Sequence, residues 1–181
     1  MSGDLLTQKY QKIFDNFDVD KDGIIEQTDI DALIQTWCRQ FGVEPRSADW
    51  QRMTTLANQM WQDVAGVAGQ TDAQGKGIVA KEGWVGVVQR PEFIDNVAVP
   101  FALVAFDLAD RDKDEKLTVD EVSKAMGAGG MSEEESQHAF SLLDTDKDGF
   151  ITKEEFRQAV VDFYKSTDPG SPGNALAGLL G

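Results

Sequence analysis

The last third of the chain contains a segment with acidic side chains at alternating positions, DTDKDGFITKEE (residues 144–155). Carboxylates at positions one, three and five of such a segment can converge on one hard cation, and a glycine at position six permits the sharp turn. The carbonyl at position seven adds an oxygen, and a glutamate at position twelve can bind through both of its oxygens. This is the spacing of the EF-hand calcium loop, and it predicts five ligands: Asp144, Asp146, Asp148, the carbonyl of Phe150, and Glu155.

The same spacing recurs at two earlier places in the chain. The segments are DVDKDGIIEQTD (loop one, residues 18–29) and DRDKDEKLTVDE (loop three, residues 110–121). In loop one the predicted ligands are Asp18, Asp20, Asp22, the carbonyl of Ile24, and Asp29. In loop three they are Asp110, Asp112, Asp114, the carbonyl of Lys116, and Glu121. We therefore predict three calcium sites, in loops one, three and four, where loop four is residues 144–155.

Two residues depart from the motif. Asp29 closes loop one, and because aspartate is one methylene shorter than glutamate, it cannot chelate with both oxygens unless the loop contracts. We expect a six-coordinate site at loop one, where Mg²⁺ competes with Ca²⁺. Glu26, at position nine, could reach the ion directly or act through water. In loop three Glu115 replaces the glycine, and a left-handed backbone there costs on the order of 1–2 kcal/mol, so we expect weakened binding.

A fourth copy keeps the apolar frame of the repeat but not its ligands. This segment, loop two, is DAQGKGIVAKEG (residues 72–83), aligned through Val79 at position eight and Trp84 at position thirteen. The other copies are also apolar at these two positions: Ile25, Leu117 and Ile151, then Ile30, Val122 and Phe156. Loop two has Lys76 at position five and Gly83 at position twelve, so we predict no ion there. We expect it to act as a structural partner, because paired loops share a backbone bridge near position eight.

Helical patterns flank the loops. Apolar residues recur at helical spacing, for example Phe14 and Phe17 before loop one, and Leu33 and Ile34 after it. The sequence therefore predicts an all-α fold of four helix-loop-helix units in two pairs. We place the amino-terminal pair at residues 1–90, the carboxy-terminal pair at residues 91–166, and an apolar tail at residues 167–181.

Composition narrows the possible partners. The chain of 181 residues has a formal net charge of -15, which argues against nucleic acid or an anionic membrane and favours cations. Cys38 is the only cysteine, so no internal disulfide can form, and the start MSGDLLTQKY lacks the apolar core of a signal peptide. The longest apolar run, residues 97–106, is too short for the roughly 20 residues of a membrane span. We expect a soluble, cytoplasmic monomer.

No catalytic group is predicted, so we do not expect an enzyme. His138, the only histidine, lies on the surface of a predicted helix that opens with a capping box formed by Ser132 and Glu135. Cys38 has no histidine nearby in the sequence and is expected to be a buried small hydrophobe. The tryptophans are expected in the core: Trp37, Trp50, Trp61 and Trp84.

The sequence resembles the four-hand sarcoplasmic calcium-binding proteins and their bacterial relative calerythrin. The resemblance covers almost the whole chain and rests on usable loops one, three and four, a degenerate loop two, the long stretch at residues 47–69, and the tail ending LAGLLG. It implies that the two EF-hand pairs pack into one compact globule. It also implies a role as a cytosolic buffer of calcium and magnesium.

Three functions remain open from the sequence. The first is an ion buffer or transporter. The second is a calcium sensor that exposes an apolar groove to a target protein, although five methionines do not favour it strongly. The third is a luciferin-binding relative, which a single histidine disfavours, since photoproteins resemble one another in several cavity histidines. For the tail, we expect Leu176, Leu179 and Leu180 to pack against the apolar face between the helix pairs.

Overall fold

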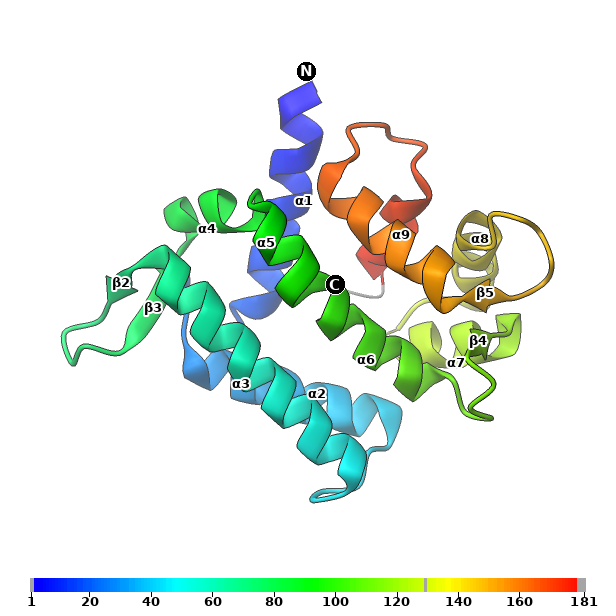
Figure 1. Ribbon diagram of the computed structural model, residues 1–181, viewed down its shortest axis with the longest axis horizontal. Coiled ribbons are helices and arrows are strands. Elements are labelled where there is room, and N and C mark those ends of the chain that lie inside the picture. Colours follow the sequence, from blue (N-terminus) through cyan, green and yellow to red (C-terminus); the bar gives the residue numbers. More distant parts are fainter. Residues whose placement is uncertain (1, 129, 179–181) are drawn as a thin grey trace.

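The computed structural model describes residues 2–128 and 130–178. Its helices are α1 (Ser2–Phe17), α2 (Gln27–Phe41), α3 (Ala48–Ala68), α4 (Lys81–Val88), α5 (Pro91–Phe93), η1 (Ile94–Ala98), α6 (Val99–Ala109), α7 (Val119–Ala128), α8 (Glu133–Leu143), α9 (Lys153–Lys165) and η2 (Pro172–Gly178). Its strands are β1 (Ile24–Ile25), β2 (Gln70–Thr71), β3 (Gly77–Ala80), β4 (Lys116–Leu117) and β5 (Ile151–Thr152). Helices dominate, and the short strands lie in or beside the loops, so the all-α prediction is confirmed (Figure 1).

Backbone pairing joins the loops two by two. In the amino-terminal half, β1 pairs antiparallel with β3 and places Ile25 opposite Val79. In the carboxy-terminal half, β4 pairs with β5 and places Leu117 opposite Ile151. All four residues are at position eight of their loops, so the alignment of loop two with the other three is confirmed.

Capping boxes begin α8 and α9. The hydroxyl of Ser132 accepts a hydrogen bond from the N–H of Glu135 (3.2 Å), and the hydroxyl of Thr152 accepts one from the N–H of Glu155 (3.3 Å). In each box the glutamate carboxylate accepts the N–H of the capping residue in return (2.9 Å). Glu155 is therefore fixed at the start of α9 as well as at the end of loop four.

Aromatic side chains join the two pairs of hands. Trp37 of α2 stacks on Phe101 of α6, with ring centroids 4.7 Å apart. Phe93 of α5 contacts both Trp84 of α4 (5.8 Å) and Tyr164 of α9 (5.7 Å). The expected core role of the tryptophans is confirmed, because Trp37, Trp61 and Trp84 are buried and Trp50 packs partly buried against the core.

Helix α1 closes against the end of α9. The hydroxyl of Tyr10 donates to the carbonyl of Tyr164 (2.6 Å), and the ammonium of Lys9 donates to the carbonyls of Phe163 (3.2 Å) and Ser166 (2.9 Å). Carbonyls in the last turn of a helix have no partner within that helix, so these side chains supply one. The first and fourth hands are thereby held together, and the predicted compact globule is confirmed.

The segment from α5 through η1 to α6 is continuous helical backbone with one π turn. The N–H of Val99 donates to the carbonyl of Ile94, five residues earlier. Pro100 has no N–H to offer the carbonyl of Asn96, which interrupts the regular helical pattern at this place. Such π turns are frequent at functional sites.

The tail folds back as η2 onto α8 and α9 (Figure 1). Leu176 is fully buried, at 0% exposure. Gly173 approaches α9 so closely that a Cβ atom at this position would collide with the backbone nitrogen of Phe163. We expected the tail between the helix pairs, but its main contacts are within the fourth hand. The expected contacts of Leu179 and Leu180 lie outside the described residues.

Other expectations concern single side chains and the membrane. His138 is exposed on α8, as expected. Cys38 is buried, and burial raises the pKa of its thiol. Among the described residues, none of the helices combines the length and the apolar character that crossing a bilayer requires.

Candidate metal centres

Loop four brings three acidic side chains together between α8 and α9. Carboxylate oxygens of Asp144, Asp146 and Glu155 lie within 4.8 Å of one another. The loop wraps around Asp144, whose two oxygens accept the N–H groups of Asp148 (3.2 Å) and Gly149 (3.1 Å). Gly149 has a φ of 90°, so the turn uses the conformation that glycine adopts freely.

Backbone donors at both ends of loop four fix the orientation of the Glu155 carboxylate. One oxygen accepts the N–H of Thr145 (3.0 Å) and the other accepts the N–H of Thr152 (2.9 Å). Burial works to raise the pKa of Glu155, but hydrogen bonds from Thr152 and Thr145 outweigh it and hold the pKa below its usual value. The carboxylate is therefore ionised at neutral pH, as an oxygen ligand for Ca²⁺ must be.

Loop three has the same arrangement. Oxygens of Asp110, Asp112 and Glu121 lie within 4.8 Å of one another. Glu121 accepts the N–H groups of Arg111 and Thr118, both at 2.9 Å, and these bonds outweigh burial and lower its pKa. Desolvation and then the charge of Asp114 raise the pKa of Asp112. The carboxylates of loop three therefore repel one another, and a bound cation would relieve this repulsion.

One buried oxygen in loop three is left without a partner. Asp110 is 2% exposed, and its Oδ1 has no hydrogen-bond donor among the described residues. Its other oxygen accepts the N–H of Glu115 (3.0 Å). A buried carboxylate oxygen without a donor is unfavourable. It fits a site where a metal ion supplies the missing contact.

Glu115 adopts the left-handed backbone that was expected of it, with a φ of 67°. Its side chain is 76% exposed and lies 3.3 Å from the ammonium of Lys153. Lys153 also contacts Asp107 of α6 (3.1 Å), and Asp107 pairs with Arg52 of α3. These ion pairs connect loop three with α9 and with a helix of the other pair.

Replacing Glu115 by glycine removes the left-handed strain, so we expect calcium affinity at loop three to rise by up to about tenfold. Calorimetric titration of calcium measures the change. Glu115→Ala is the matched control, because alanine also loses the exposed ion pair with Lys153 but keeps the strained backbone. Equal tightening in both variants would show that charge, and not the backbone, limits binding at this loop.

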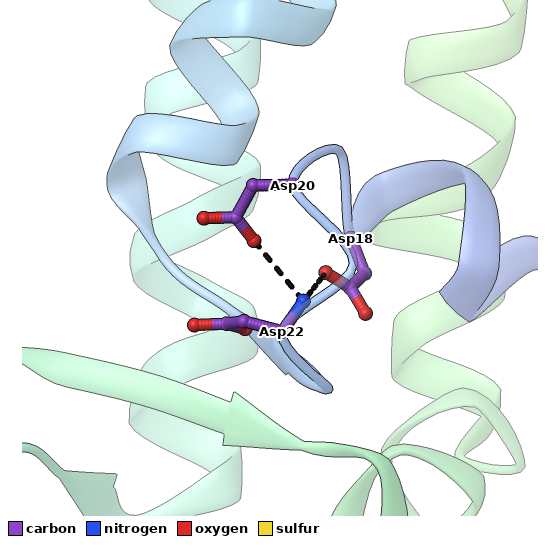
Figure 2. A group of neighbouring side chains, drawn as sticks. All are labelled: Asp18, Asp20 and Asp22. Atoms are coloured by element: carbon purple, nitrogen blue, oxygen red, sulfur yellow. Dashed lines mark hydrogen bonds between the residues drawn. The ribbon is translucent and has the colours of Figure 1, made fainter.

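Loop one assembles a different set of carboxylates. Asp18, Asp20 and Asp22 gather within 4.8 Å of one another, as Figure 2 shows. The N–H of Asp22 donates to Asp18 (3.1 Å) and to Asp20 (3.2 Å). Asp29 does not belong to this group, whereas Glu121 and Glu155 belong to theirs.

The position of Asp29 has a local cause. Its two oxygens accept the N–H groups of Val19 and Glu26, each at 2.9 Å. These are positions two and nine of the loop, which also supply the backbone donors of Glu121 and Glu155. Aspartate therefore uses the same anchors but, being shorter, stays further from the other carboxylates. The carboxylate of Glu26 accepts a hydrogen bond from the hydroxyl of Thr28 (2.6 Å) and belongs to the cap of α2.

The remaining predicted ligands lie in the loop turns. Asp114 and Asp148, at position five, fall outside the three-residue groups. Each accepts the N–H of the residue two positions later, Lys116 and Phe150 respectively, at 2.9 Å. The ligand roles of these side chains, and of the carbonyls of Ile24, Lys116 and Phe150, stay predictions.

Loop two folds as a β-hairpin. β2 pairs with β3, with Thr71 opposite Gly77. One oxygen of Asp72 accepts the N–H groups of Gln74 and Lys76, both at 2.8 Å, and the N–H of Asp72 donates to the carbonyl of Lys76 (2.9 Å). Within the described residues no group of three acidic, histidine or cysteine side chains forms at this loop. Asp18 and Asp144, at position one of loops one and four, also accept the N–H of the residue at position five, so loop two differs in its missing carboxylates and not in this bond.

Comparison with known proteins gives the same architecture. A family model described as an EF-hand domain pair matches residues 102–161, which span loops three and four. Calerythrin of Saccharopolyspora erythraea is 25% identical over 170 residues, which cover 91% of this chain and 94% of calerythrin.

Two solved structures align over most of the chain. One is a calcium-binding protein of Streptomyces coelicolor described in connection with calcium-mediated regulation, with 28% identity, coverage of 88% of this chain and 97% of that chain, and a TM-score of 0.68. The other is a sarcoplasmic calcium-binding protein from amphioxus, with 17% identity, coverage of 97% of each chain, and a TM-score of 0.73. The amphioxus match shows a shared fold.

Proposed function

We propose that this chain, which belongs to the calerythrin-like sarcoplasmic calcium-binding protein family, binds three divalent ions and acts as an intracellular buffer or transporter of Ca²⁺ and Mg²⁺. The observation that carries the proposal is the convergence of carboxylates within 4.8 Å in loops one, three and four. Three divalent ions would take the formal charge from -15 to -9 and relieve the repulsion within each loop. The cytoplasmic location and the monomeric state are part of the same proposal.

The tail favours a buffer over a sensor. A sensor must offer its target an apolar surface when calcium binds. Here η2 covers α8 and α9, and Leu176 is already buried in that contact. The sensor remains a second candidate, because the Streptomyces coelicolor relative is described in connection with calcium-mediated regulation.

The centre of the molecule gives little support to a luciferin-binding role. The cavity among the central aromatic residues, which include Trp37, Phe93 and Phe101, has a volume of about 30 Å³. Ligand pockets for drug-sized molecules are usually about 300–1,000 Å³, so this cavity is too small for one. The aromatic side chains fill this space themselves.

Calorimetric titration of calcium, with and without magnesium, tests the proposal together with a fluorescent dye that binds apolar surface. We expect three calcium ions per chain and no calcium-dependent rise in dye binding. Fewer than three ions, or a fourth ion ligated by Asp72, would contradict the assignment of the loops. Dye binding that appears only with calcium would favour the sensor instead.

Asp29→Glu should increase the preference of loop one for Ca²⁺ over Mg²⁺. The longer side chain can keep its backbone anchors and still bring both oxygens to the ion, which favours the larger cation. Calcium titration in competition with magnesium measures the shift. Asp31→Glu is the control, since it makes the same change on the exposed face of α2. Unchanged magnesium competition in Asp29→Glu would mean that loop contraction or Glu26 already completes the site.

A further inference from the structure

The described surface has a pocket beside the second hand, for which the sequence predicts no ion. A pocket of about 340 Å³ opens between α3 and the segment formed by α4, α5 and η1. Its apolar lining consists of Val64, Val67, Val87, Phe93 and Val97. Helix α3 enters loop two and α4 leaves it (Figure 1). The pocket therefore lies between the second hand and the segment of α5 and η1 that follows it.

Most of the apolar side chains that line the pocket are buried, and one of them is exposed. Val64, Val87 and Val97 are 3–5% exposed, and Phe93 is 8% exposed, so these side chains are fixed in the core. Val67 is 42% exposed and is one of three large apolar side chains that the described residues leave open to water. An apolar side chain of a partner could enter the pocket and cover Val67.

Charged groups on the rim indicate what kind of partner fits. Asp63, Arg90 and Glu92 border the pocket, and none of them forms a salt bridge within residues 2–128 and 130–178. The carboxylate of Asp63 accepts a side-chain amide hydrogen bond from Gln59 (3.2 Å). Two carboxylates and one guanidinium give the rim a net charge of -1, on a chain whose formal net charge is -15. Lysine or arginine on a partner is favoured, and an anionic ligand is repelled by the whole molecule.

Loop two, which lies beside this pocket, has no group of three acidic side chains among the described residues. The carboxylate of Asp72 is occupied by backbone donors, and the hairpin of β2 and β3 is joined to β1 of the first hand. Gly77 at the start of β3 lies so close to α3 that a Cβ atom there would be 2.8 Å from the Cβ of Ala65. Protein contacts hold α3 against the hairpin that leads into α4, so we expect the pocket to persist when calcium is removed.

We propose that this pocket is a docking site for a basic amphipathic helix of a partner protein, and that docking does not require calcium. One apolar side chain of the helix fills the space beside Val67, and its basic residues face Asp63 and Glu92. The ion-free hand holds the partner while the other three hands exchange ions. This goes beyond ion buffering, because it places the buffer at a particular partner.

Fluorescence anisotropy with a short labelled helix made only of leucine and lysine tests the proposal on the full chain. We expect the same affinity in calcium and in a chelator. Val67→Lys should weaken binding about tenfold or more, since it fills the pocket with a like charge. Glu92→Lys is a second variant on the exposed rim that leaves the core untouched. Gln35→Lys is the control, because Gln35 is exposed on α2, outside the pocket and outside the ion loops.

Several results would overturn the proposal. They are no binding of the helix, binding that requires calcium, or equal losses in Val67→Lys and Gln35→Lys. Binding of oleate that Arg90→Gln abolishes would overturn it in favour of an anionic amphiphile. Calorimetry on the same variants gives the ion stoichiometry separately, so failure of docking can be distinguished from failure of the three ion sites.

Discussion

Leu176→Ala is expected to lower the free energy of unfolding by about 2–5 kcal/mol, which is the usual cost of emptying a buried leucine site. The side chain is 0% exposed although it lies only a few residues from the end of the chain. A frayed terminus could not produce this loss, because an exposed leucine has no burial to give up. Denaturant unfolding followed by circular dichroism, in excess calcium, measures the difference.

Two glycines of the tail provide a matched pair for the same question. At Gly173 an added methyl group would collide with the backbone of α9, so Gly173→Ala must displace η2 and should cost about 1–3 kcal/mol. At Gly170 the added methyl would meet only the exposed carboxylate of Asp168, at 3.4 Å. Gly170→Ala should therefore change stability by less than about 0.5 kcal/mol. Equal effects of the two substitutions would contradict the packing of η2 on α9.

The spacing of the loops predicted their geometry well, because an ion site of this type is local in sequence. Twelve consecutive residues contain every predicted ligand of one loop, and the apolar residue at position eight identifies the partner loop. The pairing of Ile25 with Val79 follows from that position alone. Position eight was visible even in loop two, where the ligands are missing.

Contacts between distant segments could not be predicted in this way. Lys9 reaches the carbonyls at the end of α9 across more than 150 residues of sequence, and no spacing rule relates the two. The tail was correctly expected to bury Leu176 because of its apolar character. Its place on α8 and α9 depends on the close approach at Gly173, which only the folded structure reveals.

Hydrogen bonds that carboxylates in the loops form with nearby donors were also not predicted. Loop two was expected to lack an ion, but the two backbone N–H groups that Asp72 accepts in its hairpin were not predicted. The alternatives left open for Glu26 did not include a bond to Thr28 at the start of α2. In both cases a carboxylate near an acidic loop finds donors in its own backbone or in the next helix. Ligand spacing alone gives no measure of this competition.

Removal of all divalent ions is expected to produce the largest loss of stability. An ion that binds only the folded chain stabilises it by about 4 kcal/mol when its concentration is a thousand times the dissociation constant, and the proposed sites are three. Without ions the carboxylates of each loop repel one another, and the buried oxygen of Asp110 has no partner among the described residues. Chelation with EDTA should therefore lower the midpoint of thermal unfolding strongly, and added calcium should restore it.

Single substitutions divide this loss among the loops. Glu155→Gln removes one charged oxygen from loop four, while the amide oxygen can still accept the capping hydrogen bond from Thr152. The calcium-dependent part of the free energy of unfolding should therefore fall by the contribution of one site, which is about 4 kcal/mol at the same excess of ion. Asp72→Asn is the control, because we predict no ion at loop two, so any change it causes should be the same in calcium and in EDTA. A chain that unfolds at the same temperature with and without EDTA would contradict the proposal, since ions that bind the folded chain must stabilise it.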